Sequence, residues 1–404
     1  MKVLDEIRPS EEERKNVKKI IDEIFRSIKI KDAKLELGGS YAKDTFLKGS
    51  HDIDVFVKFP YEKYKSKDIS KILDKGIKLR HKKIHGSRDY FQLEKNGYSF
   101  EFIPVLDIKD SRQAKNITDV SPLHKKWVTK NLKNYDDARL MKKFCRARNV
   151  YGAESYIKGF SGYAVEILIV YYKSFINAVK SISVWRLPVY IDAGSHYKNK
   201  EEAFKRINKS KRENNLVIVD PVQKERNAAA AISREKIEML VESCRNYLHN
   251  PSDEFFIERK ISIQDLIVES GRDILMIARI RNLNGKKDVV GSKVLKVYSY
   301  IEKKLGEYEF KVKKSGWEFN SESMLYYIVK DERLSNMTIH YGPPLEHEDH
   351  VSEFRKRYRN TRIINGRISA ELKRKVKNPK DFCKEMKKDF YIREKIKKID
   401  FTLY

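Results

Sequence analysis

The sequence predicts a multidomain α+β protein, and three observations lead to that prediction. At 404 residues the chain exceeds what one ordinary hydrophobic core accommodates, so two or three domains are expected. Strand-like alternation is prominent in the first third, whereas helical spacing dominates the middle, and the last third mixes both patterns. We therefore expect an α/β domain over 1–135, a mainly helical domain over 136–253 and a mixed α/β region over 254–404.

The first domain is expected to contain helix, strand, helix, strand and strand in that order. Ser10 and Glu13 have the spacing of a capping box, and the apolar stripe that follows predicts a helix over 10–29. Alternating apolar residues over 53–57 predict a strand, and a lysine-rich helix is expected near 70–79. The segment DYFQLEKNGYSFEFIPVLDI is typical of a hairpin turned by its Asn-Gly pair.

The remaining two regions are predicted from their apolar spacing. The segment SGYAVEILIVYYKSFINAVK is apolar nearly all round, which predicts a buried helix. A strand LVIVD is expected to end at Asp220, and Asn227 to cap a helix formed by AAAAISREKIEMLVESCRNYL. After Pro251 we expect a helix around 294–301, strands around YEFKV and SMLYYIVKDE, and the basic runs FRKRYRNTR and ELKRKVKNPK.

The charge balance favours a polyanionic partner. Lysine and arginine number 86 against 58 aspartates and glutamates, which gives a net charge of +28. Such an excess is typical of proteins that bind RNA or DNA. The 23 tyrosines and 19 phenylalanines supply stacking faces for bases, although a charged surface of ion pairs stays an alternative explanation for the charge.

The cysteines and the apolar runs indicate the cellular compartment of the protein. Cys145, Cys244 and Cys383 have no metal-ligand spacing and suit a reducing environment. The N-terminus lacks the apolar stretch of a signal peptide, and the longest apolar run, near 167–172, is too short to span a bilayer. We therefore expect a soluble, cytoplasmic protein that does not use a membrane as partner.

Two aspartates in the predicted strand are the first candidate site residues. Residues two apart on a strand point to one face, so Asp52 and Asp54 should lie side by side while Ile53 points to the other face. Adjacent like charges need compensation, and a pair of Mg²⁺ ions would bridge them to nucleotide phosphates. Glu101, on the predicted neighbouring strand, is the candidate third ligand. The alternative is a solvent-facing acidic strand.

A glycine-serine turn precedes this strand. Gly39 and Ser40 would let backbone N–H groups and a hydroxyl approach phosphate oxygens closely. By itself the pair could be an ordinary tight turn. Followed by Asp-x-Asp on a strand, it predicts in-line nucleotidyl transfer, in which one metal activates a 3′-hydroxyl and another holds the triphosphate.

The segment GSYAKDTFLKGSHDIDVF resembles the signature of the nucleotidyltransferase superfamily, with its polymerase-beta-like catalytic domain. In detail the chain resembles the archaeal-type (class I) CCA-adding enzymes, which are tRNA nucleotidyltransferases. The likeness continues, in the family's order, through SPLHKKWV, ARLMKKF, VYGAESYIKGFSGYAVEILIVYY, LVIVDPVQKERNAAAAIS, YGPPLEHEDHVSEFRKRY and NGRISAEL. It covers most of the chain; FSGY and DPV…RNAAAA are its most specific parts, and 60–90 and 254–335 its least distinctive.

The resemblance implies roles for individual residues. The family's metal ligands fall on Asp52, Asp54 and Glu101, and its nucleotide-binding positions fall on Ser40, Lys43, His124, Lys142, Tyr151 and, for the incoming base, Arg226. The alternatives to a nucleotide-binding role are a surface histidine at 124, a solvent-exposed lysine at 142 and a tyrosine at 151 that only packs against its neighbours. The third carboxylate is more often aspartate in the family and the first basic residue more often arginine, so Glu101 and Lys43 put the fine geometry in question.

The resemblance further implies a reaction and its partners. The family adds C, C and A to the 3′ end of tRNA from CTP and ATP, with two Mg²⁺ ions and release of pyrophosphate. The C-terminal region would grip the acceptor stem and TΨC arm through phosphates and 2′-hydroxyls. A terminal transferase of the poly(A) polymerase type and an inactive RNA-binding relative stay as alternatives. The sequence does not distinguish a monomer from a homodimer.

Overall fold

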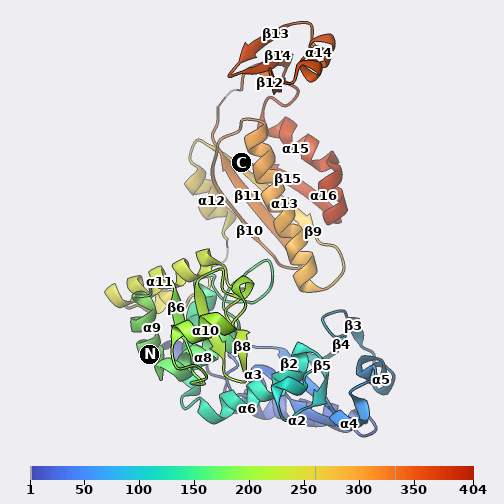
Figure 1. The fold of residues 1–404 in the computed structure, drawn as a ribbon, viewed down its shortest axis with the longest axis vertical. Coiled ribbons are helices and arrows are strands. Elements are labelled where there is room, and N and C mark those ends of the chain that lie inside the picture. Colours follow the sequence, from blue (N-terminus) through green and yellow to red (C-terminus); the bar gives the residue numbers. More distant parts are fainter. Residues whose placement is uncertain (1, 260, 333) are drawn as a thin grey trace. The chain divides into compact units, whose positions relative to one another are not determined.

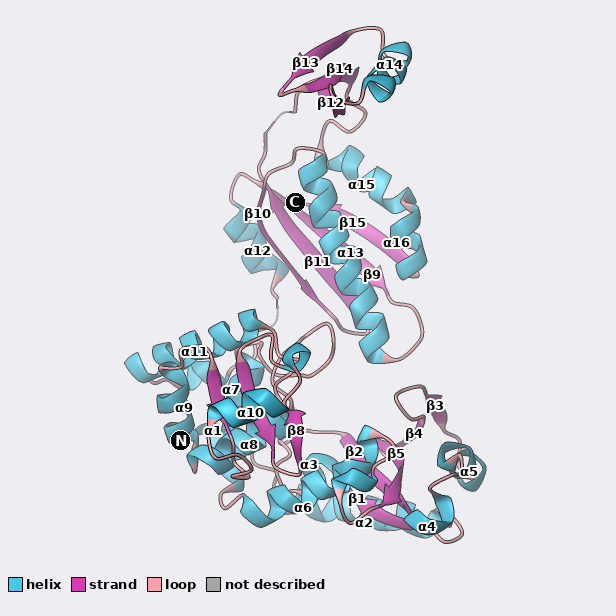
Figure 2. Cartoon of the chain, viewed as in Figure 1, coloured by secondary structure: helices cyan, strands magenta, loops and turns pink. Residues whose placement is uncertain are grey.

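The computed structural model describes residues 2–259, 261–332 and 334–404. The chain divides into two compact units, Met1–Arg259 and Lys260–Tyr404. Both units combine helices and strands (Figures 1 and 2), which confirms the predicted multidomain α+β class. The division into three domains, with boundaries after residues 135 and 253, stays a prediction.

A five-stranded sheet organises the first part of unit 1, in the order β1-β2-β5-β4-β3. The strands β2 and β5 run parallel and every other neighbouring pair is antiparallel. Apolar side chains of the sheet pack in one core with those of the accompanying helices α2, α4 and α5. The elements are α1 (Lys2–Ile7), α2 (Glu11–Ser27), β1 (Lys34–Leu37), α3 (Gly39–Ala42), β2 (Asp52–Pro60), α4 (Tyr61–Tyr64), α5 (Ile69–Gly76), β3 (Lys82–Ile84), β4 (Tyr90–Lys95), β5 (Tyr98–Asp107), and the 3₁₀ turns Ser111–Gln113 and Ile117–Val120.

Local chemistry explains the ends of these elements. The Ser10 hydroxyl accepts a hydrogen bond from the Glu13 N–H at 3.1 Å, as predicted, whereas the Glu13 carboxylate accepts from the Gly49 N–H at 3.0 Å. Glu13 therefore ties α2 to the loop before β2 instead of closing a capping box. The hairpin between β4 and β5 turns at Asn96 and Gly97, whose φ angles of 51° and 79° confirm the predicted turn.

The second part of unit 1 is mainly helical around one large core. A three-stranded sheet in the order β6-β7-β8 lies beside the helices. The elements are α6 (Ser121–Asn131), α7 (Tyr135–Ala147), α8 (Gly162–Tyr172), α9 (Phe175–Ser183), β6 (Val189–Ile191), α10 (Lys200–Arg206), the 3₁₀ turn Lys209–Lys211, β7 (Leu216–Asp220), β8 (Gln223–Asn227), α11 (Arg234–His249) and the 3₁₀ turn Asp253–Phe256.

The buried helix predicted for SGYAVEILIVYYKSFINAVK is two helices, α8 and α9. Lys173 ends α8 in the left-handed region with φ of 72°. Ser174 then caps α9, since its hydroxyl accepts from the Asn177 N–H at 3.2 Å. The apolar pattern continues through this break because both helices contribute to the same core, so periodicity alone did not reveal it.

The prediction that Asn227 caps a helix is wrong. Asn227 ends strand β8, and its side chain accepts from the N–H groups of Ile218 and Ala229, each at 2.9 Å. Helix α11 begins seven residues later, where Ser233 accepts from the Lys236 N–H at 3.2 Å. An asparagine amide can hydrogen-bond to several backbone groups at once. Here the Asn227 amide joins strand β7 to the loop that follows β8.

Unit 2 contains two sheets. A four-stranded antiparallel sheet, β10-β11-β9-β15, is covered by α12 on one face and by α13, α15 and α16 on the other. A smaller sheet, β12-β14-β13, packs with α14. The elements are α12 (Ile263–Ser270), β9 (Ile274–Arg281), α13 (Lys287–Glu307), β10 (Val312–Glu318), β11 (Glu322–Val329), β12 (Met337–Pro344), α14 (Glu348–Arg357), β13 (Thr361–Ile364), β14 (Arg367–Lys373), α15 (Pro379–Lys388), α16 (Phe390–Lys395) and β15 (Lys398–Leu403).

Two predictions for this unit differ in outcome. The helix around 294–301 is confirmed as part of α13. The strand predicted around YEFKV is present but lies further along the chain, because α13 is followed by a turn with Glu309 at φ 70° and β10 begins only at Val312. No helix among the described residues is long and apolar enough to cross a membrane. All three cysteines are free and buried.

Candidate active site

The predicted carboxylates lie on two neighbouring parallel strands. Strand β2 begins at Asp52, and its register with β5 places Asp54 directly opposite Glu101. Asp52 is exposed and Asp54 is partly buried, whereas the intervening Ile53 is completely buried on the other face. The alternation therefore presents Asp52 and Asp54 on one face of the sheet, with the Glu101 position beside them, as predicted from the period of a strand.

The glycine turn packs directly against Asp54. The Gly38 N–H donates to the Asp54 carbonyl oxygen at 2.8 Å, so the turn is anchored to the carboxylate strand. Gly39 has φ of 57°, and a Cβ atom at this position would lie 1.7 Å from the Asp54 Oδ2. Both the backbone conformation and the close approach require glycine here. Ser40 follows within α3, a single turn of helix.

The electrostatics of Asp54 follow from its surroundings. Burial raises the pKa of Asp54 to about 6, the Lys43 ammonium lowers it and the Asp52 carboxylate raises it further. Within the described ranges, no three His, Cys, Asp or Glu side chains form a ready-made metal-binding group. The donor set, carboxylate oxygens on two adjacent strands, suits a hard cation that completes its shell with water and phosphate oxygens rather than an all-protein cage.

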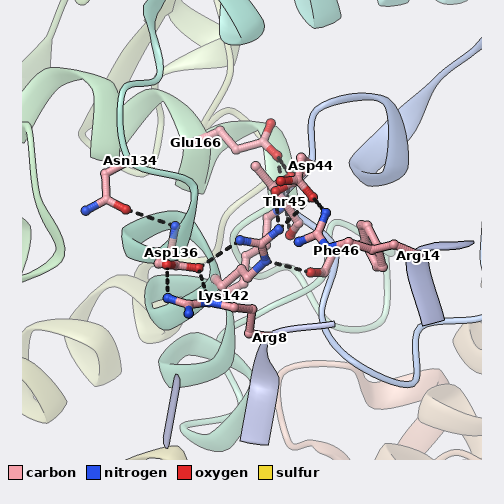
Figure 3. Close-up of polar contacts among 10 residues, drawn as sticks. Arg8, Arg14, Asp44, Thr45, Phe46, Asn134, Asp136, Lys142 and Glu166 are labelled. Carbon is pink, nitrogen blue, oxygen red and sulfur yellow. Dashed lines mark hydrogen bonds and ion pairs between the residues drawn. The ribbon is translucent and has the colours of Figure 1, made fainter. Parts of the chain in front are cut away.

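A buried carboxylate joins two of the predicted nucleotide-binding lysines. Glu166, on α8, is completely buried and accepts from the Lys43 ammonium at 2.5 Å and from the Lys142 ammonium at 2.7 Å. The Thr45 hydroxyl donates to the same carboxylate at 2.6 Å and accepts from Lys142 at 2.7 Å. Lys142 is buried, so the alternative of a solvated lysine is wrong. Figure 3 shows Thr45, Lys142 and Glu166 converging.

Burial and charge pairing act against each other in this cluster: burial lowers the pKa of Lys142, while the charge of Glu166 and its hydrogen bond raise it. Burial opposes ionisation of Glu166, but the ammonium groups of Lys142 and Lys43 outweigh it and hold the pKa of Glu166 at about 2. Two cations therefore share one anion. The cluster keeps a net positive charge next to the glycine turn, since Lys43 is the C-cap residue of α3.

An arginine network beside this cluster fastens the loop after α3 to the helical part of the unit. The Arg139 guanidinium, on α7, donates to the Phe46 carbonyl oxygen at 3.0 Å and to the Asp44 carboxylate at 2.8 Å. It also pairs with Asp136 at 2.8 Å, and Arg8 contacts the same aspartate (Figure 3). These contacts hold the loop that carries Thr45 in a fixed position relative to α7.

A second buried carboxylate joins two further predicted residues. Asp220, at the end of β7, is completely buried and accepts from His124 Nε2 at 3.0 Å and from Arg226 Nη1 at 2.6 Å. The Tyr163 hydroxyl donates to it at 3.1 Å, and the Tyr163 and His124 rings stack with centroids 4.2 Å apart. His124 is thus engaged in a network, which excludes the alternative of a simple surface histidine.

Arg226 lies in a different setting from the one predicted. It belongs to strand β8 and does not precede a helix N-terminus, because α11 begins only at Arg234. Arg226 instead lines a cavity of about 460 Å³ together with Lys211, Glu225 and four residues of the loop after β8, Ala228, Ala230, Ala231 and Ile232. This volume falls in the range of small-molecule sites.

Helix α8 links these groups. Tyr163 and Glu166 stand one turn apart on α8, one in each cluster. A Cβ atom at Gly162 would lie 2.8 Å from the Tyr151 hydroxyl and 3.8 Å from the Lys142 Nζ, so both side chains lie against the first turn of the helix. Four predicted nucleotide-binding residues therefore lie against the first two turns of α8: Lys43, His124, Lys142 and Tyr151. Arg226 is linked to α8 through Asp220, which accepts from both Arg226 and Tyr163.

Glu166 and Asp220 are the residues that sequence reasoning missed. One signal was present: each is a lone acidic residue in an apolar run, GYAVEILIV and LVIVD. A charge in such a run is buried in the folded chain and must be paired. The identity of its partners, however, could not be read from the spacing.

Comparisons with known proteins agree along the chain. Residues 14–124 match the nucleotidyltransferase domain family, residues 136–257 the second domain of tRNA nucleotidyltransferases, and residues 276–395 the C-terminal domain of the CCA-adding enzyme. The fold and the site thus define a nucleotidyltransferase, with a carboxylate strand behind a glycine turn.

Individual relatives show to which family of nucleotidyltransferases the chain belongs. The CCA-adding enzyme of Nanoarchaeum equitans is 34% identical over 353 residues, covering 84% of each chain. That of Methanosarcina mazei is 30% identical over 410 residues, covering 95% of this chain and 87% of the relative. The chain belongs to the CCA-adding enzyme family. A solved cytoplasmic RNA terminal U-transferase is 15% identical and covers 64% of this chain and 97% of its own with a TM-score of 0.49, too low a similarity to support a functional inference.

Proposed function

We propose that this chain adds C, C and A to the 3′ end of tRNA from CTP and ATP, without a nucleic-acid template and with release of pyrophosphate. The observation that carries the proposal is the similarity to CCA-adding enzymes over most of both chains. The arrangement of carboxylates, glycine turn and cationic clusters in unit 1 supplies the chemistry that such a reaction needs.

Asp52, Asp54 and Glu101 would hold divalent cations, proposed as two Mg²⁺ ions. When bound, such ions lower the pKa of a 3′-hydroxyl and neutralise charge on the triphosphate. The in-register placement of Asp54 and Glu101 supports this assignment, as does the close approach of Gly39, which keeps a Cβ away from the Asp54 carboxylate. Glu101 is one methylene longer than aspartate, so it would reach further across the strand pair.

The cationic residues would hold the triphosphate and sugar. Ser40 and Lys43 follow the glycine turn, and Lys43 retains some exposure. Lys142 already donates to Thr45 Oγ1, to the Thr45 carbonyl and to Glu166, which engages all three of its N–H groups. We therefore assign Lys142 a contribution through its positive charge. His124 and Tyr151 would contact the nucleotide beside α8.

Arg226 would read the incoming base. Its guanidinium lines a cavity large enough for a nucleoside and presents a rigid fork of donors. Cytosine and adenine offer acceptors to such donors at positions where uracil and guanine do not, and an unpaired donor in a dry pocket is costly. Selection of C and A over U and G would rest on this difference.

The direct test supplies one labelled nucleoside triphosphate at a time, with Mg²⁺, to tRNA transcripts that end before CCA, after C and after CC. We expect CTP to be used only on the first two transcripts and ATP only on the third, followed by a stop. Repeated ATP addition to any RNA would favour the poly(A) polymerase alternative. Absence of Mg²⁺-dependent pyrophosphate release would favour the inactive RNA-binding relative.

The C-terminal unit would bind the acceptor stem and TΨC arm of tRNA. Its two basic runs lie on α14 with β13 and on β14 with α15, so cationic side chains are distributed over regular elements. A-form RNA is recognised largely through its phosphates and 2′-hydroxyls. Residues 260–404 carry 33 lysines and arginines against 21 aspartates and glutamates, which is +12 of the net charge of +28.

Binding of tRNA should therefore weaken steeply with salt. With about six phosphate contacts, the dissociation constant is expected to rise by roughly a thousandfold between 50 and 200 mM salt, because counterion release drives such binding. Filter binding or fluorescence anisotropy with intact tRNA measures this slope. An affinity that stays flat over that range would contradict the electrostatic contact.

A further inference from the structure

The two oxygens of Asp220 have separate sets of partners. Oδ1 accepts from the N–H groups of Val222 and Gln223, at 2.9 and 3.3 Å, and from the Tyr163 hydroxyl at 3.1 Å. The two backbone contacts close the turn between β7 and β8 and hold the carboxylate in place. Among the residues that the structure describes, Oδ2 accepts from two side chains, His124 and Arg226, both assigned here to nucleotide binding. Oδ1 thus stabilises the local fold, and Oδ2 contacts the two side chains assigned to nucleotide binding.

The carboxylate is a permanent acceptor. Burial opposes its ionisation, but the hydrogen bond and charge of His124, the Val222 N–H and the Arg226 charge outweigh burial and hold the pKa of Asp220 at about 2. An ionised carboxylate can only accept, so His124 Nε2 must carry a proton.

Arg226 is oriented by the same oxygen. One N–H of Nη1 is directed to Oδ2 of Asp220, and the remaining N–H groups of the planar guanidinium are then fixed in direction. Arg226 side-chain exposure is 36%, so part of the guanidinium stays accessible at the 460 Å³ cavity that it lines. Without an anchor, the long arginine side chain could adopt many rotamers and present its donors in many directions.

We propose that Asp220 is a positioning residue that holds Arg226 and His124 in one arrangement and so sets base selection. This inference rests on the proposed function, since it concerns the choice of C over U and of A over G. Asp220 does not touch the nucleotide; it acts through the two side chains on its Oδ2. Discrimination by hydrogen-bond donors depends on their direction, so a freed Arg226 would bind correct and incorrect bases more equally.

Asp220→Asn tests this selectively. Asparagine can keep its carbonyl oxygen on the Oδ1 side, where the turn is closed, while its amide nitrogen replaces Oδ2 and cannot accept from His124 or Arg226. We expect the ratio of kcat/KM for CTP over UTP on tRNA ending before CCA to fall by about tenfold or more. The ratio for ATP over GTP on tRNA ending in CC should fall as well.

Tyr163→Phe is the matched control, because it removes a hydrogen bond from Oδ1 and keeps the ring that stacks on His124. Its selectivity ratios should stay within about twofold of the wild type, a difference below 1 kcal/mol. Asp220→Glu, which keeps the charge but displaces the oxygens by one methylene, answers the same question if the asparagine variant does not fold. It too should lose selectivity.

A double-variant cycle completes the test. If Asp220 acts on the base through Arg226, then adding Asp220→Asn to Arg226→Ala should leave the CTP/UTP ratio unchanged. Unchanged selectivity in both folded Asp220 variants, or an equal loss in Tyr163→Phe, would overturn the inference. A wild-type protein that uses UTP and GTP as readily as CTP and ATP would instead contradict the proposed function itself.

Discussion

Replacement of Asp54 by asparagine should lower nucleotidyl transfer by about a thousandfold while leaving the affinity for tRNA within about twofold, because a metal ligand contributes several kcal/mol at the reaction centre and nothing to RNA docking. Asp54 lies opposite Glu101 in the strand register and directly against Gly39. Single-turnover addition of labelled CTP, with tRNA binding measured separately, checks both halves of the prediction.

The matched control for Asp54 is Glu94→Gln. Glu94 is an exposed carboxylate on β4 of the same sheet, opposite Ser99 on β5, and it is not among the predicted metal ligands. Glu94 lies in one row with Ser99 and Asp52, two strand spacings (about 10 Å) from Asp52. Its replacement should leave the turnover number within about twofold, because an exposed charge at that separation is screened by solvent and contributes little to the barrier. Retained CCA addition in Asp54→Asn would remove Asp54 from the metal site.

Replacement of Glu166 by glutamine should raise KM for CTP and for ATP together, by about tenfold. Glu166 fixes Lys43 and Lys142 from one buried position, and an amide can accept a hydrogen bond but carries no charge to hold two ammonium groups. Because both lysines would lie near the triphosphate, common to all four nucleotides, the ratio of CTP to UTP use should not change. Initial-rate kinetics with each nucleotide separate these effects.

Asp119→Asn provides the comparison for Glu166. Asp119 is also completely buried and pairs with Arg88, but its other contacts are the backbone N–H groups of Leu106, Lys115 and Asn116, and no predicted nucleotide-binding residue touches it. Both variants should lower the melting temperature, since each leaves a buried cation without its partner. Only the Glu166 variant should raise KM for CTP and ATP. If the Glu166 and Asp119 variants have equal KM values, Glu166 only stabilises the fold.

The sequence by itself determined the α+β class, the carboxylate strand and the hairpin that carries Glu101. These features depend on local rules: the period of two along a strand places Asp52 and Asp54 on one face, and Asn96 with Gly97 turns the hairpin that brings β5 back along the sheet. The family was equally accessible, because its motifs are short contiguous strings whose order is visible without any structure.

Only the tertiary structure decided which buried acids organise the cationic residues. Lys43 and Glu166 are 123 positions apart, and His124 and Asp220 are 96 apart, so no local period relates them. The break between α8 and α9 and the true position of Asn227 were likewise settled by packing and by backbone hydrogen bonds from other segments. A lone acid in an apolar run must find a partner when it is buried, but which cation reaches it depends on how distant segments of the chain fold together.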